Sequence, residues 1–301
     1  MKKEFLERIS KIASDNVSSA QQILRDMIDL AIEFSRSEWA SSSFVEDLKS
    51  ICEIIASSQS QMAALKNTCT FINKRISSGS NQNISEYLLN LKEKINRSSQ
   101  IAGETASSYL HEGLSYATIS NSEFVLHTFE SAARAKKFFR VFVLESRPLF
   151  EGRQTARALK EMGHHPVLVA DAAAGIIVNE IDSAVVGADT IYSDGTLINK
   201  IGSFPLAAAC GFANKKFYAV TSALKFDRAR CIGDFKPRPE SPQELFANPE
   251  IECLNTYFDA VPANFIEALI TEVGIFFPRN SALENNTWGD AILRSMEEVY
   301  G

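Results

Sequence analysis

The chain of 301 residues lacks the short motifs that place many proteins in a common class. No Gly-x-Gly-x-x-Gly phrase opens a helix and no P-loop phrase occurs, so the sequence supports neither a dinucleotide site nor a nucleoside triphosphatase. No apolar run approaches the length of a membrane span. The formal net charge is −6 and the isoelectric point is near 5.4, which argues against direct nucleic-acid binding because that needs a basic surface.

The cysteines are also too scattered to form a metal or disulfide framework. There are five, without a C-x-x-C pair, and the four histidines offer no zinc spacing with them. We therefore predict no metal site and no cofactor. An odd number of cysteines, together with a charged start that enters a helix directly, predicts reduced thiols, no signal peptide, no membrane partner and a cytoplasmic location.

The first third of the chain has no proline over residues 2–116 and shows helical spacing throughout. One example is the series Ile23, Met27, Leu30 and Phe34, in which apolar residues recur every three or four positions. Residues 15–19 predict an N-terminal cap for the second helix, and residues 77–82 predict a turn. No catalytic constellation is visible here. We predict an N-terminal helical domain over residues 1–118.

Beyond this region, short apolar strands alternate with helices. The predicted strands cover residues 124–127, 140–144, 166–169, 183–186 and 217–220, and the predicted helices cover 152–162, a short stretch from 172, and 202–211. This rhythm is typical of a mostly parallel sheet with helices on both faces. The predicted fold class is therefore α/β, with a Rossmann-like domain over residues 119–301 following the helical domain.

Polar side chains follow several of these strands where each strand ends. They are Glu145, Arg147, Asp171, Asp189, Thr221 and Ser222. The carboxyl ends of parallel strands meet at one edge of a sheet, where open α/β folds bind their ligands. We therefore expect these groups to converge there.

Residues 181–205 form the most informative stretch. A short apolar strand breaks at Gly187 and Asp189 follows it, a tight turn comes at residues 194–195, and Asn199 and Lys200 precede a helix that begins near Gly202. The first N–H groups of a helix attract anions, so this stretch fits a phosphorylated small molecule. The alternative is that these residues only cap turns or face solvent.

Two arginines extend the same hypothesis. Arg147, together with Arg153 or Lys200, is suited to neutralise a phosphate. In the alternative interpretation Arg147 pairs with Glu145 at the surface.

Toward the C-terminus the patterns are simpler. Residues 236–242 form a loop with three prolines, which serves either as a docking segment or as a plain connection. Residues 275–277 fit a final buried strand or an interface, and residues 291–300 predict a last helix.

Several of these phrases together resemble a known family. They are residues 145–148 with Gly152, residues 186–189, 194–195 and 199–203, and then residues 255–262 and 270–274. In this order they are similar to the translation initiation factor 2B alpha/beta/delta family, over roughly residues 120–278. That family contains a regulatory alpha subunit and two sugar-phosphate isomerases, which act on methylthioribose 1-phosphate and ribose 1,5-bisphosphate.

The resemblance implies roles for individual residues. Asp189 matches an acid that works on the open-chain sugar, and Asn199 with Lys200 matches a pair that holds the substrate. The isomerases also use a cysteine that follows a Leu-Thr-His phrase. Laid on residues 125–128, this phrase puts Phe129 at the cysteine position, and Phe129 cannot exchange protons. His127 or Glu130 is the alternative partner group.

On this basis we predict a regulatory or subunit role, with a translation factor as a candidate partner, rather than catalysis. The predicted ligand is a phosphorylated sugar or nucleotide, and the predicted oligomer is a homodimer or larger. The predicted ligand-binding residues are Arg147, Arg153, Asp189, Asn199 and Lys200. The alternative is a sugar-1-phosphate aldose–ketose isomerase with Asp189 as the catalytic group, and the third possibility is a scaffold without a ligand.

Overall fold

The computed structural model describes residues 3–15, 20–38, 43–58, 62–78, 83–248, 250–279 and 287–301. Most of the predicted cap and turn, residues 16–19 and 79–82, lies outside the described residues. The chain divides into two compact units. The first consists of Met1–Arg97, Leu224–Phe226 and Arg294–Gly301, and the second consists of Ser98–Ala223 and Asp227–Leu293.

The first unit is helical, as the spacing predicts. Its helices are α1 (Lys3–Ala13), α2 (Ala20–Glu38), α3 (Phe44–Ser58), α4 (Ala63–Ser77), the first part of α5 (Ile84–Ser107) and the end of α10 (Thr287–Tyr300). The apolar stripe of α2 is fully buried, and the Phe34 ring lies 5.2 Å from that of Phe5 and 5.7 Å from that of Phe44. The Tyr87 hydroxyl donates to the Tyr300 carbonyl over 2.9 Å, which fastens the last turn of the chain to this unit.

The second unit is built on a seven-stranded sheet with the order β11-β10-β7-β4-β1-β2-β3. Its strands are β1 (Ser115–Ile119), β2 (Arg140–Leu144), β3 (His165–Val169), β4 (Ser183–Val186), β7 (Lys216–Val220), β10 (Ala268–Thr271) and β11 (Gly274–Phe276). All neighbours are parallel except β11, which runs antiparallel to β10. The predicted fold class, a helical region followed by a mostly parallel α/β sheet, is confirmed.

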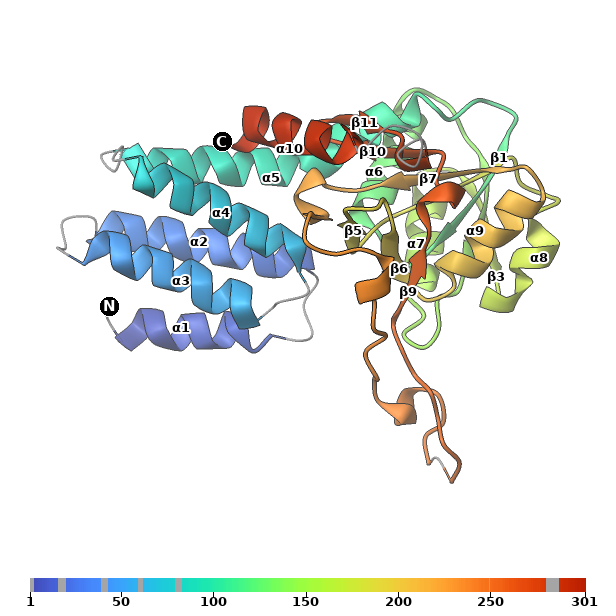
Figure 1. The fold of residues 1–301 in the computed structure, drawn as a ribbon. Helices are drawn as coiled ribbons and strands as arrows, with labels where there is room; N and C mark the ends of the chain where they lie inside the picture. The colour runs from blue at the N-terminus through green and yellow to red at the C-terminus, as the bar shows by residue number, and fades with distance from the viewer. Residues whose placement is uncertain are drawn as a thin grey trace. The chain divides into compact units, whose positions relative to one another are not determined.

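Helices cover both faces of this sheet (Figure 1). The end of α5, α6 (Glu123–Arg134) and α7 (Gly152–Glu161) contribute to one core cluster with inward side chains of β2, β4, β7 and β10. On the other face α9 (Ser203–Phe212) packs against β4 and β7, with α8 (Ala174–Ile177) beside it. Short 3₁₀ helices occur at Asp171–Ala173, Ala223–Lys225, Ile232–Asp234, Pro242–Glu244 and Ala263–Phe265.

A small second sheet follows the main one. Its strands are β5 (Thr190–Tyr192), β6 (Leu197–Lys200), β8 (Phe226–Asp227) and β9 (Phe258–Val261), and β6 pairs antiparallel with both β5 and β9. The predicted turn between β5 and β6 is confirmed, with Gly195 at a φ of 83°. Pairing with β9 sets Asn199 opposite Asp259 and Lys200 opposite Phe258. This register fixes where the amide and the amine of β6 lie.

One predicted strand is wrong. Residues 124–127 belong to α6, whose buried residues Phe124, Val125, Thr128 and Phe129 recur with helical rather than alternating spacing. The true first strand is β1, which begins at Ser115, before residue 119 where the sequence predicts the α/β domain to begin. β1 is buried between β2 and β4, so Tyr116–Ile119 are all buried and the strand, Ser-Tyr-Ala-Thr-Ile, shows no apolar–polar alternation between its two faces.

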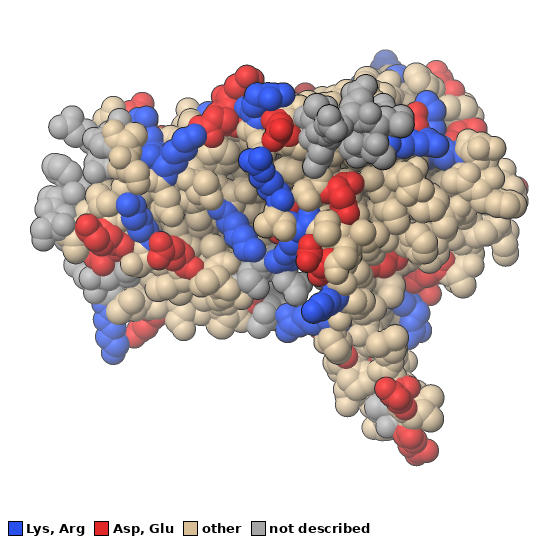
Figure 2. All heavy atoms as spheres, in the orientation of Figure 1, with Lys and Arg blue, Asp and Glu red and all other residues tan. Residues whose placement is uncertain are grey.

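An extended arm, residues 232–256, leaves the second unit and contains the predicted proline-rich loop (Figure 1). On the face drawn in Figure 2, described lysine and arginine side chains are interspersed with aspartate and glutamate side chains. Within the described part of the chain, no helix has both the length and the apolar character needed to cross a membrane.

Candidate functional site

The order of the strands defines one special place in the sheet. From β1 the chain moves outward to β2 and β3, and then returns to the other side of β1 to lay down β4, β7 and β10. The connections therefore diverge between β1 and β4, and ligands of open α/β sheets bind in the crevice outside the strand ends at such a switch point. The residues that follow β1 and β4 are consequently the first candidates for a functional site.

After β1 the chain turns sharply at Ser120, which has a φ of 68°. Its N–H group donates to the Ser146 hydroxyl over 2.7 Å, and its carbonyl accepts from the Thr155 hydroxyl over 2.7 Å. The turn is thereby tied to the end of β2 and to α7. No hydrogen bond joins the Ser120 hydroxyl to any other described residue. This hydroxyl, which sequence reasoning missed, stands at the switch point.

After β4 the chain passes through Gly187 and reaches Asp189. A Cβ atom on Gly187 would lie 2.6 Å from the Ser122 hydroxyl oxygen and 4.0 Å from the Asn199 amide oxygen. The two strand ends and β6 therefore approach so closely that only glycine fits. The Asp189 N–H group donates to the Ile198 carbonyl over 2.8 Å, which places this half-buried aspartate beside β6.

The predicted pair Asn199 and Lys200 is almost fully buried, with 4% and 5% of its surface exposed. The Asn199 side-chain amide donates to the Ser203 hydroxyl over 2.9 Å. The Lys200 ammonium lies 2.6 Å from a carboxylate oxygen of Glu151, and 4.9 Å from the centre of the Tyr257 ring. The hypothesis that Lys200 is a solvated amine is therefore wrong.

The ion pair between Lys200 and Glu151 is incomplete. The second oxygen of Glu151 is buried and has no hydrogen-bond partner among the described residues. A buried charge needs both a partner and full hydrogen bonding to offset its loss of water. Glu151, which was not predicted, therefore brings an unsatisfied acceptor to the start of α7.

The predicted anion seat at the start of α9 is occupied by the protein itself. Asp259 accepts hydrogen bonds from the N–H groups of Gly202 and Phe204 over 2.9 and 3.0 Å. The prediction that these N–H groups are open to a ligand is wrong. Sequence reasoning missed this contact because Asp259 is far along the chain and reaches the helix only through the pairing of β9 with β6.

The carboxyl of Asp259 has a raised pKa. Burial raises the pKa of its carboxyl from 3.8 to about 6, although the N–H groups of Phe204, Gly202 and Ser203 favour the charged form. One of its oxygens is buried without a hydrogen-bond partner in the described part of the chain. Desolvation therefore outweighs the helix N-terminus at this position.

The two predicted arginines lie together at the end of β2. Their guanidinium carbons are 5.2 Å (Arg147) and 3.9 Å (Arg153) from the centre of the Phe150 ring, so both pack on one aromatic side chain. Arg153 pairs with Glu145 over 2.9 Å. The alternative in which Arg147 takes Glu145 is thus wrong, because Arg153 occupies that carboxylate, while Arg147 is exposed.

Phe129, the predicted position of the missing cysteine, lies on a helix, in the core, rather than after a strand. Phe129 is fully buried in α6, and its ring lies 6.3 Å from Tyr116 and 6.3 Å from Phe139, so it is a core residue. When the Leu-Thr-His phrase is laid instead on Ala117–Ile119, at the end of β1, only its threonine is retained and the next residue is Ser120. The useful signal was the Ser-Asn-Ser turn, residues 120–122, that follows the short Ser-Tyr-Ala-Thr-Ile strand.

Both alternative partner groups lie on α6 rather than directly after a strand. His127 and Glu130 lie one turn apart on α6 and contact each other over 2.9 Å. The pKa of the Glu130 carboxyl lies below its ordinary value despite partial desolvation, because it accepts hydrogen bonds from His127 and Arg134. These three side chains form a local network on the helix.

Comparison with known proteins supports the resemblance across most of the chain. Residues 13–278 match the Initiation factor 2 subunit family. A ribose 1,5-bisphosphate isomerase from Archaeoglobus fulgidus is 28% identical over 284 residues, which cover 91% of this chain and 90% of that protein. A second ribose 1,5-bisphosphate isomerase, from Methanocaldococcus jannaschii, is 32% identical over 184 residues, or 60% of each chain.

The solved structures lead to the same family. A translation initiation factor eIF-2B from Pyrococcus horikoshii OT3 superimposes with a TM-score of 0.78 at 25% identity, covering 93% of this chain and 99% of that one. A 5-methylthioribose 1-phosphate isomerase from the same organism has a TM-score of 0.73 at 20% identity, covers 98% of this chain and 87% of that one, and shows the shared fold. The chain belongs to the Initiation factor 2 subunit family.

Proposed function

We propose that the second unit binds a phosphorylated sugar at the switch point and catalyses an aldose–ketose isomerisation, with Asp189 as the acid–base group. We thereby prefer the isomerase to the purely regulatory role that the sequence favours. The sequence-based preference for a regulatory role depends on Phe129 standing at the partner position, and Phe129 is a core residue. The relative from Archaeoglobus fulgidus, similar over nearly the whole chain, supports the same choice.

A single observation carries the proposal. β1 and β4 are parallel neighbours with Ala117 opposite Ala184, so three residues further along each strand Ser120 comes level with Gly187. Asp189 follows two residues later. A hydroxyl and a carboxylate therefore stand at adjacent strand ends in the crevice where this fold class binds ligands.

The chemistry requires two such groups. Isomerisation of an open-chain sugar moves a proton or a hydride between adjacent carbons while the two oxygens exchange their roles as carbonyl and hydroxyl. In the proposed arrangement the Asp189 carboxylate takes up and returns the proton. The Ser120 hydroxyl donates a hydrogen bond to the sugar oxygen, on which negative charge develops.

The phosphate is proposed to bind beside Arg147 and Arg153. Arg147 is exposed and has no carboxylate partner among the described residues, and Arg153 shares its guanidinium between Glu145 and the Phe150 ring. A guanidinium presents a planar fork of donors that matches phosphate oxygens. Asn199 and Lys200 are proposed to contact the sugar on its other side, next to Gly187.

A second candidate is a subunit that binds the same ligand without turnover. It is favoured by Ser120 itself. A thiol with an ordinary pKa of about 8.5 exchanges protons near neutrality, whereas a serine hydroxyl does not readily do so. This candidate retains the predicted regulatory role and its translation-factor partner.

The deciding experiment combines calorimetry with NMR. Ribose 1,5-bisphosphate and methylthioribose 1-phosphate are titrated into the purified protein, and each mixture is followed for ketose product. We expect product from the wild type and none from Asp189→Asn, with the exposed Asp290→Asn as the control for removing a charge. Binding without product establishes the second candidate instead. The absence of heat with either sugar refutes both.

The role of the buried pair needs a different variant. Lys200→Ala alone leaves the partly buried Glu151 without its partner, which costs up to about 3–5 kcal/mol and confuses binding with folding. Lys200→Met combined with Glu151→Gln removes both charges together. If Lys200 contacts the sugar, this double variant keeps its thermal stability and loses affinity. Unchanged affinity would remove Lys200 from the proposed ligand set.

We also propose that the chain self-associates through its arm, residues 232–256. The arm exposes Ile251 and Leu254 by 72% and 85%, and it also exposes Leu245 and Phe246, so one segment carries several of the apolar side chains that mark interaction sites when they gather. One solved structure with the same fold is a tetrameric eIF2B-beta2-delta2 complex from C. thermophilum. Sedimentation of Leu254→Glu tests this proposal: we expect a smaller species than the wild type, and an unchanged one would exclude the arm.

A further inference from the structure

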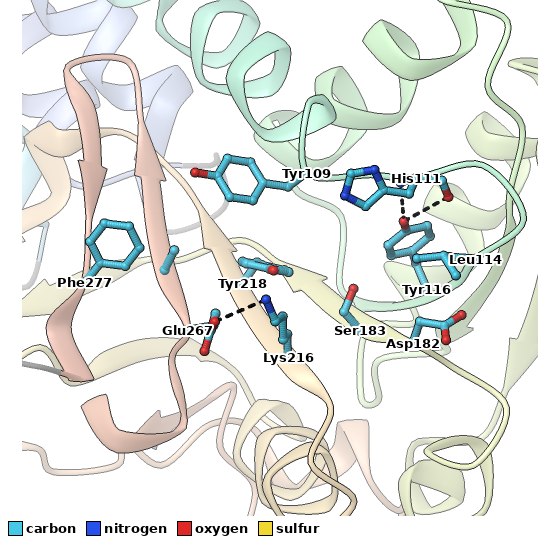
Figure 3. Close-up of a pocket in the computed structure, with 11 residues that line it drawn as sticks. Tyr109, His111, Leu114, Tyr116, Asp182, Ser183, Lys216, Tyr218, Glu267 and Phe277 are labelled. Atoms are coloured by element: carbon cyan, nitrogen blue, oxygen red, sulfur yellow. Dashed lines mark hydrogen bonds and ion pairs between the residues drawn. The ribbon is translucent and has the colours of Figure 1, made fainter.

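A cavity opens at the edge of the seven-stranded sheet opposite to the switch point. It lies beside the first residues of β4, β7 and β10, where Ser183, Lys216 and Ala268 contribute to its wall (Figure 3). Its volume is about 340 Å³, within the range of small-molecule sites. All of its lining residues belong to the second unit. The proposed sugar-phosphate site uses none of them.

The wall of the cavity is largely aromatic. The rings of Tyr109 and Tyr218 are 5.8 Å apart with an interplanar angle of 57°, and Phe277 lines the cavity from beyond β11 (Figure 3). Phe277 is 48% exposed, so part of its ring is accessible to a ligand in the cavity. Rings of this kind offer flat faces on which a planar ligand can stack.

Hydrogen-bonding groups of both kinds stand around these rings. Lys216 lies 3.4 Å from one oxygen of Glu267, and Arg279 lies 3.7 Å from the other oxygen. Asp182 presents a second carboxylate, which accepts from the Ser115 N–H group over 2.8 Å. Burial raises the pKa of the Tyr218 phenol, so its hydroxyl stays protonated at neutral pH.

The charges limit the class of ligand. Lys216 and Arg279 are both paired with Glu267, and Asp182 adds a further negative charge, so an anion such as a phosphate finds no lysine or arginine without a carboxylate partner in the cavity wall that the structure describes. Carboxylates accept from N–H groups, and an ammonium donates to ring nitrogens or carbonyl oxygens. The lining thus complements a molecule that is flat, uncharged, and equipped with both donors and acceptors.

We propose that this cavity is a second binding site, which takes an unphosphorylated aromatic heterocycle carrying an amino group. The rings of Tyr109 and Phe277 stack on its faces, and Glu267 and Lys216 bond to its edge. Because the cavity and the switch point lie at opposite strand ends, the two sites do not overlap and both can be occupied at the same time. Binding at the cavity therefore does not depend on the proposed isomerase activity.

The experiment uses adenine and cytosine as probes, with inorganic phosphate and cyclohexylamine as the anionic and non-planar comparisons. Binding to the full chain is measured by saturation-transfer NMR and calorimetry. Removal of one stacking ring is expected to weaken binding by about tenfold. We therefore expect Phe277→Ala and Tyr109→Ala each to raise the Kd of adenine or cytosine by about that factor. Phe138→Ala is the matched control, because Phe138 is exposed by 45% and does not line the cavity.

Three outcomes would overturn the proposal. The first is that neither heterocycle binds saturably up to its solubility limit. The second is that Phe277→Ala and Phe138→Ala have the same effect. The third is that heterocycle binding is lost in the Lys200→Met and Glu151→Gln double variant but kept in Phe277→Ala, which places the ligand at the switch point. Glu267→Gln keeps the shape of the wall and reports on the polar contact if either ring variant fails to fold.

Discussion

Replacement of Asp259 by asparagine tests the electrostatics of the α9 N-terminus. In the folded protein, burial raises the pKa of this carboxyl from 3.8 to about 6. The folded state therefore binds more protons than the unfolded chain between these two values, and stability falls as the pH rises through that window. A shift of roughly two pH units, at about 1.4 kcal/mol for each, corresponds to about 3 kcal/mol of lost stability above pH 6.

Asparagine removes this cost while keeping the hydrogen bonds, since its amide oxygen can accept from the N–H groups of Gly202 and Phe204. We expect Asp259→Asn to be more stable than the wild type by up to about 3 kcal/mol at pH 8. At about pH 3.5, where the wild-type carboxyl is largely protonated in both states, the two proteins should be equally stable.

The assay is urea unfolding at both pH values, followed by the fluorescence of the buried Trp288 in a Trp39→Phe background. Glu161→Gln, at an exposed position of the same unit, is the control for removing one negative charge. A helix N-terminus stabilises a carboxylate by about 0.3–2 kcal/mol. If this attraction outweighs burial, Asp259→Asn will be less stable than the wild type at pH 8, and that result would refute the dominance of desolvation at Asp259.

Three further variants test the site and its surroundings. Phe129→Ala removes a buried core side chain and should lower the free energy of urea unfolding by about 3–5 kcal/mol, whereas Phe138→Ala, at an exposed position, should change it by less than about 0.5 kcal/mol. Similar values for the two variants would contradict the assignment of Phe129 to the core. Ser120→Cys should raise the rate of ketose formation in the NMR assay by about tenfold or more with little change in ligand Kd, because a thiol exchanges protons more readily than a hydroxyl. An unchanged rate would remove Ser120 from the reaction. Gly187→Ala should lower stability in thermal unfolding by about 1–3 kcal/mol, because the new Cβ would lie 2.6 Å from the Ser122 oxygen, and adding Ser122→Gly should recover most of that loss. Equal losses in the single and double variants would refute the clash.

The family and the broad architecture can be predicted because they depend on local signals. Apolar spacing in the first third and alternating short strands afterwards reflect which side chains each element buries. The phrases around Asp189 and Asn199 are contiguous in the chain, so their resemblance to a family is visible in the sequence itself. The edge of the sheet at which the polar strand ends meet follows from the parallel topology alone.

The first strand escapes prediction for a physical reason. β1 is covered on both edges by β2 and β4 and on its faces by helices, so it has no alternation to separate it from a helix. The next apolar stretch, which contains Phe124 and Phe129, imitates a strand in its composition although its burial recurs with helical spacing. This ambiguity places the isomerases' cysteine position on Phe129, and the preference against an enzyme depends on that placement.

The sequence by itself determined the helical and α/β organisation, the family, and the presence of Asp189, Asn199 and Lys200 near a strand end. Only the tertiary structure decided which partners these residues have. Asp259 fills the helix N-terminus and Glu151 neutralises Lys200, although each is separated from its partner by about fifty residues of chain. Such contacts arise from strand pairing and helix packing, whose energies depend on residues distant in sequence, and a local pattern carries no record of them.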